Sequence, residues 1–307
     1  METPAIAAPA HIVASAARRR AILCVLGASA CFAVAAAFVK AVAGAFPTFE
    51  IVAFRSGLAT LATLPLLWRI GGLRALRTRR PWSHVWRMIW GFTGMATSFY
   101  GYATLPLATN TALGFAMPLV LTVLSVPLLG ERVGWRRYTA VLVGLVGVLV
   151  VVRPWGGAAD ALPLVPAAVV LFGVVAWALA MISIRKMGEA GESNVVIVLW
   201  FSIGSTVMAA VLTVPVWVTP DPLQLAALCA VGVISALAQM LMTEGYRAGE
   251  TTLVAPFEYG AIIYTTTLGL VIWGEVPDGW SLLGIAIIIG SGLYIWRREA
   301  VLGVRRS

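Results

Sequence analysis

The stretch GYATLPLATNTALGFAMPLVLTVLSVPLLGE at residues 101–131 returns in diverged form as GYRAGETTLVAPFEYGAIIYTTTLGLVIWGE at residues 245–275. Both copies open with Gly-Tyr and close with Gly-Glu, and Thr122 and Leu124 also have identical mates 144 positions later. Identities are sparse elsewhere, but the segment lengths are kept without a gap, as expected of an old internal duplication. The second half of the chain is therefore predicted to repeat the fold of the first.

The composition indicates that this fold is surrounded by lipid. Of 307 residues, 60% are apolar and 11% charged, with a mean hydropathy of +0.93, whereas a soluble domain has about 45–50% apolar and about 25% charged residues. A bilayer core is crossed by roughly 20 helical residues. We therefore expect an all-α polytopic membrane protein with ten transmembrane helices, at residues 20–40, 48–68, 86–104, 107–129, 136–153, 164–185, 194–216, 223–246, 252–274 and 279–297.

Positively charged residues orient these helices. With a cytoplasmic N-terminus, all but three of the 22 Lys and Arg residues fall on the cytoplasmic side; Lys40 and Arg153 lie on the other side and Arg55 lies within a helix. The positive-inside rule thus predicts that both termini lie in the cytoplasm. The net charge of +9 fits anionic lipid headgroups, so we expect the lipid bilayer and no nucleic acid among the partners.

Five helices in each half give the second half the opposite orientation, so the prediction is two inverted five-helix repeats. Residues 1–19 are expected to form a mobile cytoplasmic N-terminus, 20–155 the first repeat, 164–298 the second repeat and 299–307 a cytoplasmic tail. Inverted repeats favour alternating access, because exchanging the conformations of the two halves turns an outward-open cavity into an inward-open one.

Enzyme signatures are missing from the sequence. His11 and His84 lie outside the predicted spans, and there is no GxxxxGK phosphate loop and no carboxylate pair inside a helix. The three cysteines, Cys24, Cys31 and Cys229, have no metal-ligand partners nearby. We therefore expect no catalytic residues, no metal and no cofactor, and transport driven by a solute or ion gradient.

Local motifs add a family resemblance to this architecture. They are Phe49-Glu50 with Phe54-Arg55-Ser56, Leu105-Pro106-Leu107-Ala108, Leu129-Gly130-Glu131-Arg132 and Val152-Arg153-Pro154. Over residues 20–298 the chain resembles the bacterial drug/metabolite transporter superfamily, in particular its EamA-type members, and the aromatic amino-acid exporters are one candidate type. The resemblance implies a location in the bacterial inner (plasma) membrane. The resemblance implies a transporter of small organic solutes, often an exporter of amino acids, although the cargoes of the superfamily include S-adenosylmethionine, sugars and drugs.

Charged residues inside predicted helices are the first site candidates, because a charge at a helix centre costs about 2.5–3.5 kcal/mol on insertion scales. Arg55 is expected either to lock helices together or to act in transport. Glu244 either pairs with Arg247 three residues later or acts in the cavity, and Glu258 lies on a polar helix face. Arg55, Glu244 and Glu258 are thus candidates for ion coupling or helix locking.

Polar and aromatic residues on the third, sixth, eighth and ninth predicted helices are candidates for binding the substrate. The set comprises Thr97, Tyr100, Trp177, Gln239, Thr243, Glu258 and Tyr259. A threonine stripe would equally serve helix packing, and aromatic residues in apolar helices usually pack or anchor, so both alternatives stay open.

The offset of 144 residues ranks these candidates. Glu244 is the repeat mate of Tyr100, and Glu258 that of Gly114, whereas Tyr102 has an identical mate in Tyr246. Repeated residues are expected to maintain the fold, and residues that differ between the halves to recognise the cargo. Tyr100 therefore ranks above Tyr102 as a cargo residue.

Helix breakers indicate positions for kinks. Gly114 and Pro118 lie mid-span in the fourth predicted helix, and Pro256 lies in the first turns of the ninth, its repeat mate. Each proline removes an intrahelical hydrogen bond. These kinks either let helices move during transport or only shape static packing.

Three functions remain open at this point. The first is export of hydrophobic or aromatic amino acids, or related small metabolites, by alternating access. The second is uptake of S-adenosylmethionine or a similar nucleoside-like metabolite, which should rely more on acidic cavity residues. The third is a membrane scaffold or channel component that does not transport. A monomer or weak dimer is expected.

Overall fold

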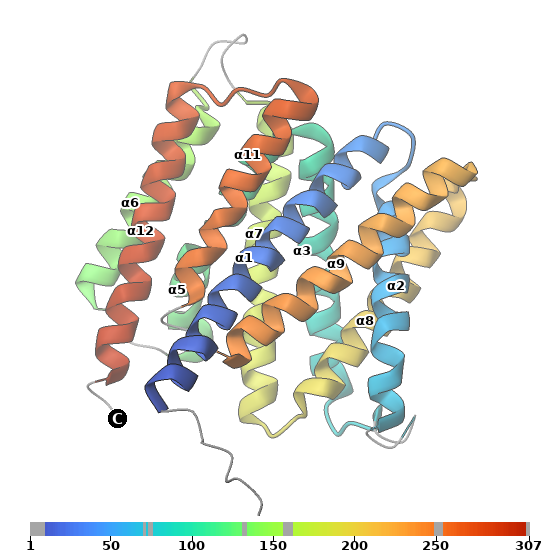
Figure 1. Ribbon diagram of the computed structural model, residues 1–307, viewed down its shortest axis with the longest axis horizontal. Helices are drawn as coiled ribbons and strands as arrows, with labels where there is room; N and C mark the ends of the chain where they lie inside the picture. Colours follow the sequence, from blue (N-terminus) through green and yellow to red (C-terminus); the bar gives the residue numbers. More distant parts are fainter. Residues whose placement is uncertain are drawn as a thin grey trace, which may run out of the picture.

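The computed structural model describes residues 10–69, 72, 76–130, 134–155, 162–248 and 254–304. Within these ranges the chain is a bundle of helices without strands (Figure 1). The helices are α1 (Ala10–Val42), α2 (Thr48–Arg69), α3 (Pro81–Thr104), α4 (Leu107–Gly114), α5 (Met117–Leu129), α6 (Trp135–Val152), α7 (Leu164–Glu189), α8 (Asn194–Thr213), η2 (Val214–Val216), α9 (Pro222–Ala248), η3 (Ala255–Tyr259), α11 (Gly260–Trp273) and α12 (Gly279–Val304).

Ten helical spans result when α4 joins α5 and η3 joins α11, which confirms the predicted number. Six of them are long and apolar enough to cross a bilayer by themselves, and they cover residues 18–42, 107–129, 164–189, 195–216, 222–248 and 279–298. The other four are α2, α3, α6 and the span of η3 and α11, and they pack within the same bundle. The chain is a multi-pass membrane protein.

Helix contacts follow the symmetry of an inverted repeat. The helix α1 packs on α9. Since α7 is the repeat mate of α1 and α3 is the repeat mate of α9, the equivalent pair is α3 and α7, which is also in contact. The pairs α6 with α12 and α2 with α8 join helices that are mates of each other. In Figure 1 these two pairs stand at opposite sides of the bundle, with α1 and α9 crossing between them. Every major contact thus joins one repeat to the other, as the predicted pair of repeats requires.

Both broken spans are interrupted at equivalent positions. The residues Phe115 and Ala116 separate α4 from α5, and the junction of Tyr259 and Gly260 separates η3 from α11, 144 residues later. Pro118 lies in the first turn of α5. The break expected near Gly114 and Pro118 is therefore present, and its mate lies beside Pro256 in η3.

The repeated Gly-Glu motif ends a helix in each half. Gly130 caps α5 with φ of 69°, and Gly274 caps α11 with φ of 68°. A left-handed cap favours glycine because other residues place Cβ too close to the backbone. Arg153 also has a positive φ, of 46°, at the end of α6, whereas Arg297 lies inside α12. The arginine pair therefore keeps the offset of 144 residues but not the conformation.

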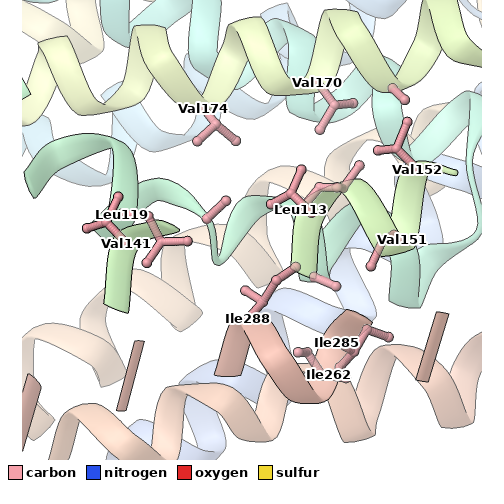
Figure 2. Close-up of a cluster of buried hydrophobic side chains, with 14 of the residues drawn as sticks. Leu113, Leu119, Val141, Val151, Val152, Val170, Val174, Ile262, Ile285 and Ile288 are labelled. Carbon is pink, nitrogen blue, oxygen red and sulfur yellow. The ribbon is translucent and has the colours of Figure 1, made fainter. Parts of the chain in front are cut away.

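The largest apolar core joins the two halves. Figure 2 shows buried side chains of this core that converge from both repeats: Leu113 of α4, Leu119 of α5, Val141, Val151 and Val152 of α6, Val170 and Val174 of α7, Ile262 of α11, and Ile285 and Ile288 of α12. All ten are at most 7% exposed. Because the first repeat supplies α4 to α6 and the second α7 to α12, neither half completes this core alone.

The first described turns of α1 and the last turns of α12 lie at the same end of the bundle (Figure 1). We call this the basic end, because it also carries Arg20 in the first half of α1, and Arg80, Lys186 and Arg247 at helix starts and ends. The opposite end carries Lys40 at the end of α1, and we call it the Lys40 end.

Candidate functional site

A cavity of about 290 Å³ lies between the two repeats. Its walls come from α1, α2, α3, the two parts of the fourth span, α7 and α9. Aromatic and sulfur-containing residues form much of the surface, namely Phe32, Met95, Phe99, Tyr102, Met117 and Trp177. The polar residues in the wall are Arg55, Ser98, Asn110 and Ser235. Such a mainly apolar pocket with a few polar groups is typical of small-molecule sites.

Two glycines bring α3 and α7 together at the cavity. A Cβ atom on Gly94 would lie 2.8 Å from Cε3 of Trp177, and one on Gly173 would lie 1.8 Å from Oγ1 of Thr97. A side chain at either position would therefore displace its neighbour. This close approach places the Trp177 ring in the wall of the cavity.

Arg55 is the one charged residue among the described residues of the cavity wall. It lies seven residues after the start of α2, about 10 Å along the helix. Its Nη1 donates to Sδ of Met95 at 3.0 Å, and sulfur is a weak acceptor. No ion pair joins Arg55 to a described carboxylate. The cavity therefore has a positive group at one wall.

Asn110, another residue of the cavity wall, holds α4 against α3. Its Nδ2 donates to the carbonyl oxygen of Ser98 at 3.1 Å. Gly101 allows this approach, because a Cβ atom there would lie 2.1 Å from Oδ1 of Asn110. The turn after Gly101 thus sets the position of the first part of the fourth span.

The structure places one predicted substrate residue, Trp177, in the cavity wall. Thr97 faces α7 instead, and its hydroxyl donates to the carbonyl oxygens of residues 93 and 94 at 2.8 and 3.1 Å. Tyr100 lies in α3 outside the wall. Gln239 and Thr243 are exposed on α9, where the Thr243 hydroxyl donates to the carbonyl oxygen of Gln239 at 2.8 Å.

Glu258 and Tyr259 lie together at the break in the ninth span, outside the cavity wall. The half-buried Glu258 accepts a hydrogen bond from the Tyr246 hydroxyl of α9. The Tyr259 ring packs on the ring of Phe115, with centroids 4.6 Å apart. Since Phe115 and Tyr259 are repeat mates, this contact joins the two equivalent breaks.

Glu244 forms ion pairs at the basic end. It lies 2.8 Å from Nη2 of Arg20 in α1 and 3.9 Å from Nη1 of Arg247 in its own helix. The predicted pair with Arg247 is thus present, but the shorter contact joins the two repeats. Glu244 therefore links α9 of the second repeat to α1 of the first.

Reasoning from the sequence missed an ionic cluster at the Lys40 end. Lys40 pairs with Glu275, and its Nζ also donates to the carbonyl oxygen of Leu105 at 2.8 Å. Glu275 in turn accepts from the backbone N–H of Leu107 at 2.9 Å, and Lys40 lies 5.6 Å from the centroid of the Trp273 ring. These contacts tie α1 and the turn between α3 and α4 to the end of α11.

The signals for this cluster were present in the sequence. Lys40 was one of only two cations on its side of the membrane, and Glu275 closed a repeated motif. Spacing along the sequence does not predict a contact between Lys40 and Glu275, because they lie 235 positions apart. A second cavity, of about 280 Å³, lies beside the cluster and is lined by Glu275, Arg153 and Asp278 among others.

The fold, the repeat symmetry and the cavity between the repeats define a transporter architecture, and comparison with known proteins assigns its family. The chain belongs to the EamA-like transporter family, whose model matches twice, at residues 19–153 and 165–297. The resemblance found in the motifs is thereby confirmed, although the aromatic amino-acid exporter type is not.

Curated relatives are named for chemically different cargoes. The chain is 32% identical over 269 residues to the pseudopaline exporter of Pseudomonas aeruginosa, covering 87% of this chain and 93% of the relative. It is 30% identical to the riboflavin transporter of Rhizobium johnstonii, with 83% of each covered. It is 29% identical to the S-adenosylmethionine uptake transporter of Rickettsia bellii, with 81% and 83% covered.

A solved crystal structure shares the fold. It matches with a TM-score of 0.60 and 22% identity, and the alignment covers 91% of this chain and 98% of the other. The family and its named relatives indicate that this chain is a small-metabolite transporter.

Proposed function

We propose that the protein exports amino acids with hydrophobic or aromatic side chains, or closely related metabolites, by alternating access. The observation that carries this proposal is the central cavity, which has aromatic walls and is built from both repeats. Phe32, Phe99 and Trp177 offer ring surfaces to an apolar side chain. Ser98 and Asn110 offer polar groups to the charged end of an amino acid.

The size of the cavity supports a small cargo. Its volume of about 290 Å³ is at the lower limit of ordinary ligand pockets, which hold about 300–1,000 Å³. Phenylalanine or leucine suits this volume better than riboflavin or S-adenosylmethionine, which are larger molecules.

Uptake of S-adenosylmethionine remains the second candidate, and it is favoured by the names of several relatives. The charges in the cavity support it less. The described wall holds an arginine and no carboxylate, so it offers no negative side chain to the sulfonium of that cargo. A scaffold without transport is not supported by membership in a transporter family.

Reconstituted proteoliposomes would decide between the candidates. Vesicles loaded with unlabelled phenylalanine, tryptophan, leucine, S-adenosylmethionine or riboflavin are tested for counterflow of the same labelled compound. We expect counterflow with the amino acids and none above empty vesicles with the other two. Counterflow with S-adenosylmethionine alone would refute the proposed cargo. Efflux from preloaded cells that express the protein tests the direction, and retention equal to that of control cells would refute export.

We also propose a bacterial inner membrane location with both termini in the cytoplasm. The cations gathered at the basic end support this orientation by the positive-inside rule. Reporter fusions at the two termini and at Gly44, between α1 and α2, test it, because only the Gly44 fusion should report a periplasmic position. We propose a monomer or weak dimer, which light scattering of the detergent-purified protein tests.

A further inference from the structure

We infer that Arg55 binds the carboxylate of the transported solute, so that the central cavity selects anionic or zwitterionic cargo over cationic and neutral analogues. This inference rests on the proposed function and names the chemical group that the site recognises. It is carried by a guanidinium that faces a cavity and has no carboxylate partner in the described part of the protein.

The charge of Arg55 costs free energy because it lies within a membrane-spanning helix. An arginine stays protonated in proteins, and about 10 Å along a transmembrane helix such a charge normally has a partner or a water-filled cavity. Its one hydrogen bond, to Met95, uses one of five donors and a weak acceptor. The remaining donors are left for water or a ligand.

The acidic residues of the described chain form no ion pair with Arg55. Glu50, five residues before Arg55 in α2, accepts from the backbone N–H of Val218 at 3.1 Å. Five residues correspond to about 140° around a helix, so Glu50 lies on a different face from Arg55. Glu275 pairs with Lys40, and Glu258 accepts from the Tyr246 hydroxyl. The protein therefore supplies no described counter-ion to the cavity.

A second arginine gives a useful contrast. Arg87 in α3 is also buried without a described carboxylate partner, at 7% exposure, but its guanidinium lies 4.1 Å from the centroid of the Phe201 ring. Arg87 does not line the central cavity. An aromatic ring covers Arg87 through a cation–π contact, whereas open space adjoins Arg55. Of the two, only Arg55 therefore has room beside it for an anion.

A carboxylate fits the chemistry of the free donors. The guanidinium fork donates two parallel hydrogen bonds to the two oxygens of one carboxylate. With its carboxylate at Arg55, an amino acid would extend its side chain toward Phe99 and Trp177 in the same wall. Neutralising the charge also lowers the cost of closing water out of the cavity, so binding would favour the occluded state that alternating access needs.

The test compares solutes that differ in the carboxylate alone. Counterflow is measured in proteoliposomes with phenylalanine and with phenylalaninamide, for the wild type, Arg55→Gln, Arg55→Lys and the control Arg87→Gln. Thermal stabilisation of the purified variants by 3-phenylpropionate and by 3-phenylpropionamide gives a second, transport-independent measurement. Arg87→Gln removes a buried guanidinium outside the cavity and so reports the general effect of such a loss.

We expect the wild type to carry phenylalanine and to be stabilised by 3-phenylpropionate. Arg55→Gln should reduce phenylalanine counterflow about tenfold or more, because hydrogen bonds to charged groups contribute about 1.5–3 kcal/mol, while changing phenylalaninamide counterflow less than about twofold. Arg55→Lys should keep part of the preference, since it keeps the charge but not the fork. Arg87→Gln should change both solutes by the same factor.

The outcomes separate this inference from the proposed function. If Arg55→Gln carries phenylalanine as the wild type does, or loses both solutes equally, the inference fails while amino-acid transport stands. If phenylalanine is not carried but 3-phenylpropionate stabilises the wild type and not Arg55→Gln, the proposed cargo fails while the carboxylate site stands. A wild type that responds to none of these carboxylates overturns the inference.

Discussion

At the scale of single residues, the position of the cavity favours Tyr102 over Tyr100 as the tyrosine that contacts the cargo. Tyr100 differs from its repeat mate whereas Tyr102 is repeated, and this difference predicts Tyr100 as the better candidate for a cargo residue. In the structure, however, Tyr102 lies in the cavity wall and Tyr100 does not. A residue that is repeated for the fold can therefore also face the cargo. The rule that repeated residues only maintain the fold does not describe this pair.

We predict that Tyr102→Ala lowers phenylalanine counterflow about fivefold more than Tyr100→Ala. Loss of an aromatic contact with the cargo costs about 0.5–1.5 kcal/mol beyond the lost area, and only Tyr102 is placed to make that contact. Counterflow is compared at equal amounts of reconstituted protein. A larger loss for Tyr100→Ala would support the original ranking and count against the cavity as the binding site.

Sequence reasoning placed only part of the site. The sequence predicts functional roles for Arg55, Gly114 and Trp177, because a charge, a helix break and a large ring inside a membrane helix each need a structural reason. All three residues lie in the cavity wall. Helical spacing also predicts Thr243 and Gln239 as site residues, but spacing shows only that residues share a helix face and not where that face points. Their face is exposed on α9.

At the scale of helices, the two glycine caps test the repeat directly. We predict that Gly130→Ala and Gly274→Ala each destabilise the protein by about 1 kcal/mol, because both glycines have a left-handed φ. No atom lies within 4 Å of a Cβ at either position, so the backbone alone causes the loss. The melting temperature in detergent should fall by a few degrees for both variants.

Gly279→Ala is the matched control for the two caps. Its Cβ would also meet no atom within 4 Å, and its φ is not positive. The melting temperature of this variant should stay near that of the wild type. Equal losses for all three alanine variants would show that the cap conformation is not the cause.

A charged cap joins two further helices and makes the stability of the protein depend on pH. Asp278 accepts from the Ser281 backbone N–H at 2.7 Å at the start of α12, and it pairs with Arg153 at the end of α6 at 2.5 Å. Burial by itself raises the pKa of Asp278, but hydrogen bonds from Ser281 and the charge of Arg153 outweigh it, so the pKa lies below its ordinary value.

We predict that Asp278→Asn reduces the loss of stability on acidification. Because the folded-state pKa of Asp278 is lowered, its contribution is complete above the ordinary aspartate pKa of about 3.9 and is lost as the pH falls further. Asparagine keeps a cap acceptor but not the charge. Melting temperatures between pH 6 and pH 3 should fall less steeply in the variant than in the wild type.

Asp221→Asn provides the control for this experiment. Asp221 also accepts from a backbone N–H at a helix start, that of Gln224 at 2.8 Å, but it has no ion-pair partner among the described residues. The fall of the melting temperature between pH 6 and pH 3 should differ less from that of the wild type in Asp221→Asn than in Asp278→Asn. The same slope in both variants would mean that Arg153 does not contribute.

At the scale of the whole molecule, the sequence predicted the architecture better than the site. Ten spans and two repeats follow from hydropathy and the offset of 144 residues, because lipid requires long apolar helices and duplication preserves their spacing. The ionic cluster of Lys40 and Glu275 depends on where helix ends meet after folding. That meeting joins α1 of the first repeat to Glu275, which lies two residues after the end of α11 in the second, and no local pattern encodes it.

The symmetry of the fold separates contacts that should persist during transport from contacts that should break. When two inverted repeats exchange conformations, a contact between repeat mates maps onto itself. Phe115 and Tyr259 form such a contact. Lys40 and Glu275 are not repeat mates, so the symmetry does not preserve their contact. We expect their ion pair at the Lys40 end to break when that end opens. We expect the first pair to act as a pivot and the second as a closure.

Cross-linking tests this distinction in a background without Cys24, Cys31 and Cys229. We predict that a short thiol cross-linker between cysteines introduced by Phe115→Cys and Tyr259→Cys leaves counterflow within about threefold of the same variant without cross-linker. The same reagent on Lys40→Cys with Glu275→Cys should abolish counterflow, because the Lys40 end can then no longer open. Counterflow lost in both pairs would exclude the pivot, and counterflow kept in both would exclude closure at Lys40, since an alternating-access carrier must open each end once in every cycle.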